Sequence, residues 1–111
     1  MIASPLNGDG VRVWVTVQPV DTRKSFDGLA EVVRTFLGND PLSDSLFVFR
    51  NRSSQRLKIL WYDRDGLAIH YKRLSRGAFR FPSGEDKVLA IDSAQLLRLL
   101  SGMTVAATKD A

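Results

Sequence analysis

The chain has 111 residues, of which 44% are apolar and 25% charged, a balance that predicts one globular domain with one hydrophobic core rather than a disordered segment. It contains no cysteine, which excludes disulfides and thiolate metal sites. No apolar run approaches the roughly 20 residues that span a bilayer, and the first ten residues lack the pattern of a secretory signal. These features predict a cytoplasmic protein.

Positive charge is concentrated in the middle of the chain. The segment from Arg50 to Arg80 contains nine basic residues and only two acidic ones, Asp63 and Asp65. The rest of the chain has seven basic and ten acidic residues. Such a distribution is typical of a surface that binds anions. The alternative is that these basic residues only keep a sheet soluble and protect its edges.

The first elements are a strand and a helix. Residues 1–10 are rich in glycine and polar residues and predict a loose arm. Apolar residues alternate over positions 11–17, which predicts a strand that ends before Pro19. Ser25 or Thr22 can then cap a helix whose apolar stripe runs from Phe26 to Leu37 and stops at Gly38.

The second half predicts a run of strands followed by a helix. The strands are expected at 46–50, 56–62, 67–74, 78–81 and 87–91, with turns between them. Asp92, with Gln95 three residues later, resembles a capping box before a helix that ends at Gly102. Residues 103–111 are expected to be a frayed tail. The prediction is a single α+β domain over residues 11–102: an antiparallel sheet meander of about five or six strands, with the first helix on one face and the last helix at an edge or end.

Turn geometry predicts which side chains share a sheet face. A three-residue loop at 64–66 places Asp63 opposite Leu67 and Lys58 opposite Lys72. One face is then a coherent core made of Leu57, Ile59, Trp61, Leu67, Ile69 and Tyr71. The other face carries Arg56, Lys58, Leu60, Tyr62, His70 and Lys72. The like-charge pair of Lys58 and Lys72 is mildly destabilising, and an anionic ligand would relieve its repulsion.

This face and the basic residues around it are the predicted nucleic-acid-binding site. Its members are Arg50, Arg52, Arg56, Lys58, Tyr62, His70, Lys72, Arg73 and Arg76. Arg23 and Lys24, at the start of the first helix, are possible additional contacts, although pairing with Asp21 and Asp27 is the structural alternative.

The residue pattern contains no recognisable catalytic or metal site. His70 is the single histidine and has no partner at a diagnostic spacing. Asp63 and Asp65 flank Arg64 in a typical hairpin turn. The aromatic residues Trp14, Trp61, Phe26, Phe36, Phe47 and Phe49 are expected in the core rather than as stacking platforms. No cofactor is expected, and the chain is predicted not to be an enzyme.

Several runs resemble a known family. They are Pro19–Leu29, Leu46–Arg52, Arg56–Asp63, Gly66–Leu67 leading to Tyr71–Leu74, and Gly77–Pro82. Together they are similar to the small TnpB accessory protein, encoded by the second reading frame, of the IS66 class of bacterial insertion sequences, which is unrelated to the RNA-guided nuclease of the same name. The likeness spans about Val11 to Gly102. Ser25 stands where the family usually has glycine, and Phe81 where it often has tryptophan.

The resemblance implies a protein that is needed for efficient transposition beside a separate transposase, and it implies no catalytic residues. The charge distribution adds the expectation that the chain binds DNA through a basic sheet face. The second hypothesis is a protein-interaction module that binds the transposase or another element-encoded protein.

Overall fold

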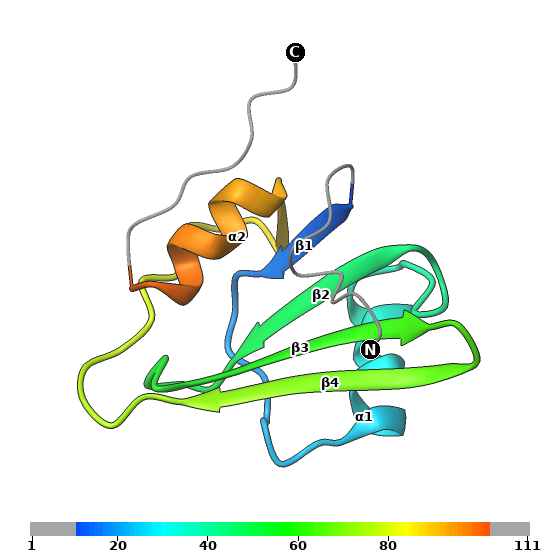
Figure 1. Cartoon of the computed structure of the whole chain (residues 1–111), viewed down its shortest axis with the longest axis horizontal. Helices are drawn as coiled ribbons and strands as arrows, with labels where there is room; N and C mark the ends of the chain where they lie inside the picture. Colours follow the sequence, from blue (N-terminus) through cyan, green and yellow to red (C-terminus); the bar gives the residue numbers. More distant parts are fainter. Residues whose placement is uncertain (1–10, 103–111) are drawn as a thin grey trace.

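The computed structural model describes residues 11–102, so the predicted arm and tail lie outside the described residues. It is built around one five-stranded sheet in the order β4-β3-β2-β1-β5. The strands are β1 (Arg12–Thr16), β2 (Ser45–Arg50), β3 (Arg56–Asp63), β4 (Gly66–Arg73) and β5 (Val88–Ile91). Figure 1 shows the sheet between two helical layers, which confirms the predicted α+β class.

The sheet is mixed, which corrects the prediction of an antiparallel sheet. β1 and β2 are parallel and are joined through the first helix, whereas the other three neighbouring pairs are antiparallel. The predicted strand at 78–81 is also wrong. This segment is a connection whose Phe79 amide donates to the Ser54 carbonyl at 2.7 Å. Its alternating pattern arises because Phe79 and Phe81 pack against the core while Arg80 is exposed.

The first helix lies across one face of the sheet. α1 (Phe26–Glu31) continues into a π-helical turn, η2 (Val32–Phe36), and Gly38 closes it with a φ of 64°, as its position in the sequence predicted. Leu29, Ala30 and Val33 are buried against side chains of β2 and β3. Phe26 and Phe36, which were expected in the core, are 45% and 37% exposed because they lie at the two ends of this short helix.

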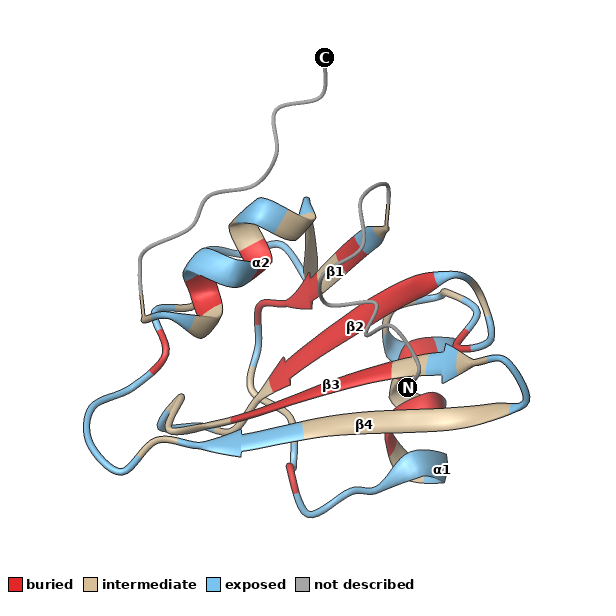
Figure 2. Cartoon of the chain, viewed as in Figure 1, coloured by how far each residue is buried: buried red, intermediate tan, exposed pale blue. Residues whose placement is uncertain are grey.

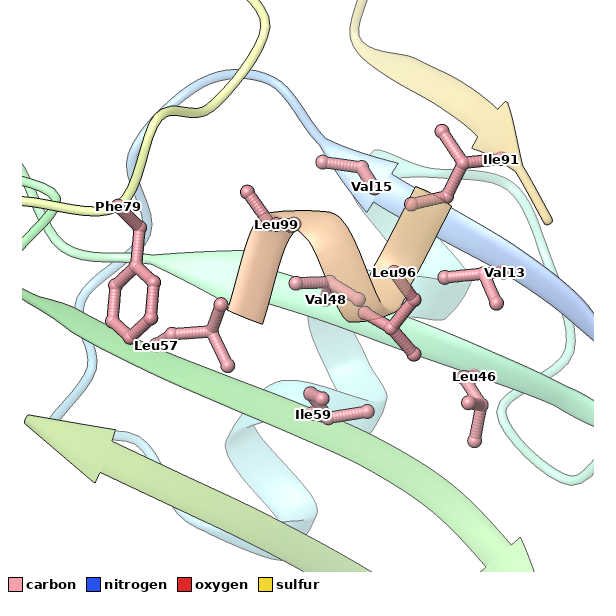
Figure 3. Packing of buried hydrophobic residues seen from close by; sticks show 10 residues of the cluster. All are labelled: Val13, Val15, Leu46, Val48, Leu57, Ile59, Phe79, Ile91, Leu96 and Leu99. Carbon is pink, nitrogen blue, oxygen red and sulfur yellow. The ribbon is translucent and has the colours of Figure 1, made fainter. Parts of the chain in front are cut away.

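The second helix covers the opposite face. α2 (Ser93–Leu100) is capped at its N-terminus by Asp92, whose carboxylate accepts a hydrogen bond from the Gln95 amide at 2.8 Å. Figure 3 shows Leu96 and Leu99 of this helix above the apolar side chains of β1, β2 and β3. The last helix therefore lies on a sheet face, not at an edge or end as predicted.

The register of the β3–β4 hairpin differs from the predicted one, because helices cover both faces of the sheet. The turn contains two residues, Arg64 and Asp65, and Asp63 pairs with Gly66. Within this turn Arg64 takes a positive φ of 58°. As a result, Leu60 and Ile69 pair on the face of α1, while Leu57 and Ile59 point toward α2. Figure 2 shows β2 buried along nearly its whole length, as expected for a strand covered on both sides.

Candidate functional site

Three connections meet at one end of the sheet, where β1, β2 and β4 end and β3 and β5 begin. They are residues 17–25, 51–55 and 74–87. Backbone hydrogen bonds join them: the Val17 amide donates to Lys87, the Val20 amide to Arg50 and the Leu74 amide to Gln55, at 2.8–3.0 Å. The parallel arrangement of β1 and β2 produces this convergence, because both strands send their following loops to the same end.

This end carries most of the basic side chains, and we call it the basic end. Its exposed or half-exposed cations are Arg23, Lys24, Arg52, Arg56, Lys72, Arg73, Arg76, Arg80 and Lys87. The acidic side chains of the same segments are Asp21, Glu85 and Asp86. Seven of these cations were predicted contacts. Arg80 and Lys87 were missed, because only the folded chain brings the 74–87 connection beside the other two.

A like-charge pair lies at the edge of the basic end. Arg56 and Arg73 are directly opposite each other on β3 and β4, and both are on the face of α1. The predicted pair of Lys58 and Lys72 is wrong. Lys58 lies opposite Tyr71 on the face of α1, whereas Lys72 lies opposite Leu57 on the face of α2. The cross-strand repulsion expected from the sequence therefore exists, but between two arginines.

Lys58 is an internal residue, not a free surface cation. Its side chain is only 8% exposed. The Nζ atom donates to the Lys24 carbonyl at 2.8 Å and lies 4.7 Å from the centre of the Tyr71 ring. This contact joins the segment before α1 to the sheet, so Lys58 positions the basic end rather than extending from it.

Arg50 is also used within the fold. Its Nε and Nη2 atoms donate to the Val17 carbonyl at 3.0 and 2.8 Å, and its Nη1 donates to the Ser54 hydroxyl at 3.2 Å. Partial burial lowers the pKa of the Arg50 guanidinium from its ordinary value. The side chain ties the end of β1 to the β2–β3 turn, and its donors face the protein.

A polar hollow of about 440 Å³ lies within the basic end, beyond the carboxyl ends of the parallel strands β1 and β2. Its lining includes Arg23, Arg52 and Asn51. Arg23 forms two side-chain hydrogen bonds of 3.0 Å with Asp21, and these bonds, with a third from the Arg23 amide, lower the pKa of Asp21 to about 2. The structural pairing that the sequence analysis kept open for Arg23 is therefore present.

The other end of the sheet has the opposite charge, and we call it the acidic end. Five of its side chains are acidic and two are basic: Asp40, Asp44, Asp63, Asp65 and Asp92 against Arg12 and Arg64. Tyr62 lies at this end, in a shallow hollow with Asp44. His70 is half-buried on the face of α2, opposite Ile59. Neither residue joins the basic cluster as predicted, so the charge separates along the strands rather than between the two sheet faces.

Comparison with known proteins places the chain among proteins of insertion sequences. Residues 11–110 match the family described as IS66 Orf2 like protein. Uncharacterized protein y4hO of Sinorhizobium fredii (strain NBRC 101917 / NGR234) is 45% identical over 97 residues, covering 87% of this chain and 84% of that protein.

A second protein of the same organism, uncharacterized protein y4jC, is 34% identical over 94 residues, covering 85% of this chain and 80% of its own length. No solved structure matches the chain. No helix within residues 11–102 is long and apolar enough to cross a membrane. The extent of the family match and the identity to these relatives show that the chain belongs to the IS66 Orf2 like protein family, whose members are accessory proteins of insertion sequences.

Proposed function

We propose that this protein is a non-catalytic accessory factor of transposition that binds the DNA backbone through its basic end. One observation carries the proposal: nine exposed or half-exposed cations from separate loops and strands gather at one end of the sheet, where the connecting loops contribute three acidic side chains and the first turn of α1 adds Asp27. Within residues 11–102, only Arg23 among these cations forms an ion pair. The remaining cations are available to phosphate groups.

The form of this surface favours contact with phosphates over reading of bases. Its side chains are long, flexible cations on three loops and two strand ends, whereas base readout needs an element shaped to enter a groove. The hollow beyond β1 and β2 adds Arg23, Arg52 and the Asn51 amide as donors suited to a phosphate oxygen. Binding of this kind releases counterions, so the affinity should fall steeply with salt.

The test is a titration of a short DNA duplex, followed by fluorescence anisotropy at several salt concentrations. The test variant is Arg76→Gln with Arg80→Gln, because both side chains are exposed on the 74–87 connection. Each phosphate contact contributes roughly 0.9 to the slope of log K against log salt. If both arginines contact phosphates, the slope of the variant should therefore be shallower by about 1.8.

The matched control is Arg12→Gln with Arg64→Gln at the acidic end, which removes the same net charge. We expect this control to leave the slope nearly unchanged. An equal loss of slope in both variants would show that only total charge matters and would contradict a defined interface. Retention of the transposase or another element-encoded protein at low salt, without any shift of DNA, would identify an acidic protein surface as the partner of the basic end.

A further inference from the structure

The two edges of the sheet differ in the way that they meet solvent. β5 forms one edge with only four residues, whereas β4 forms the other with eight. β4 pairs with β3 in a continuous register from Gly66 to Arg73, without a bulge, and contains no proline. Short strands, bulges, prolines and charged side chains are common protections of an edge against pairing with another strand. β4 has none of the first three, and its Lys72 and Arg73 lie together at one end of the strand.

The direction of the peptide groups on β4 follows from its pairing with β3. The Leu74 amide donates to the Gln55 carbonyl directly opposite, and hydrogen-bonded pairs alternate in an antiparallel ladder. The peptide groups of the even-numbered residues of β4 therefore face β3. The amides and carbonyls of Leu67, Ile69, Tyr71 and Arg73 face away from the sheet, where another strand can bind.

The charges at the two ends of β4 indicate which strand can pair with this edge. β4 begins beside Asp63 and Asp65 at the acidic end and finishes with Lys72 and Arg73 at the basic end. Two copies of β4 in antiparallel orientation bring each basic end beside the acidic end of the other copy. A parallel arrangement would place like charges together. The edge is therefore complementary to itself in the antiparallel orientation.

We propose that β4 pairs antiparallel with β4 of a second copy of this chain, centred on Ile69, to form a continuous sheet through two subunits. Ile69 then lies opposite Ile69 of the second copy and Leu67 opposite Tyr71, with their outward peptide groups matched. The same register brings Arg73 opposite Asp65 of the second copy. This proposal uses Arg73 of the basic end but does not rest on DNA binding, and it is tested without DNA and with residues other than Arg76 and Arg80.

Sedimentation equilibrium of the full chain over a range of concentrations tests the proposal. The wild-type protein should show a reversible monomer–dimer equilibrium. Arg73→Asp alone and Asp65→Arg alone should each weaken dimerisation by about tenfold, because each places two like-charge pairs in the dimer. An equimolar mixture of the two variants should recover wild-type association, since the mixed dimer has both pairs with opposite charges.

Ile69→Pro supplies a second test. The Ile69 amide faces away from β3, so proline removes no hydrogen bond from the β3–β4 ladder, yet it blocks pairing with a further strand. This variant should be a folded monomer by circular dichroism and sedimentation. A wild-type chain that stays monomeric at every concentration, a mixture that fails to recover association, or a dimer that persists in folded Ile69→Pro would each overturn the proposal.

Discussion

Replacing Lys58 with methionine should destabilise the protein while leaving its contacts with DNA unchanged. Methionine keeps most of the apolar stem of lysine but removes the ammonium group. That group donates to the Lys24 carbonyl at 2.8 Å and lies 4.7 Å from the Tyr71 ring centre. The substitution therefore removes the hydrogen bond between the sheet and the segment that leads into α1, and also the contact with Tyr71 on the neighbouring strand β4.

The magnitude follows from the two contacts. A hydrogen bond from a charged donor contributes about 1.5–3 kcal/mol, and a partly exposed cation–π contact adds about 0.5–1 kcal/mol. Part of this loss is offset, because methionine does not need to be dehydrated as a buried ammonium does. We expect the free energy of unfolding to fall by about 2 kcal/mol, which lowers Tm by roughly 8 °C in a domain of this size.

Urea unfolding followed by tryptophan fluorescence measures the stability, and anisotropy with duplex DNA measures the salt slope. Lys72→Met is the matched control, because it removes the same charge from an exposed position on β4. Lys72→Met should change stability by less than about 0.5 kcal/mol and make the slope shallower by up to about 0.9. Wild-type stability in Lys58→Met, or a loss of slope as large as in Lys72→Met, would refute the internal role of Lys58.

Three further predictions concern the framework of the site. Arg50→Lys should lower the free energy of unfolding by about 2 kcal/mol in urea titrations, because lysine cannot reproduce the forked donors to the Val17 carbonyl. The Asp21 carboxyl should titrate by NMR with a pKa of about 2 and return toward 3.8 in Arg23→Ala. Since folding depresses this pKa, the stability it contributes is present above about pH 3.8 and is lost as the pH falls through about 2. Leu96→Ala should cost about 2–5 kcal/mol by chemical denaturation, because this side chain of α2 is fully buried between the helix and the sheet.

Local patterns in the sequence predicted most of the secondary structure. Gly38 ends the first helix and Asp92 caps the second, as expected from residues that suit those positions. Five strands lie within a residue or two of their predicted bounds. These features depend on neighbours close in the chain, which is why pattern and turn chemistry suffice to locate them.

The predicted hairpin register was wrong because it depends on a sheet with one apolar face and one polar face. The observed sheet has helices on both faces, so Leu60 and Ile69 are needed on the side opposite Leu57 and Ile59. The unbroken apolar run of Leu46–Phe49 is the signal that could have revealed this arrangement, because such runs are typical of strands buried on both sides.

The sequence alone determined the composition of most of the candidate site, a concentration of arginine and lysine between Arg50 and Arg80. Tertiary structure decided which of those cations are available. Lys58 and Arg50 bind backbone carbonyls inside the fold, whereas Arg80 and Lys87 join the exposed cluster. The physical reason is that a parallel β1–β2 pair sends separate loops to one end of the sheet, and no local pattern specifies which distant strands become neighbours.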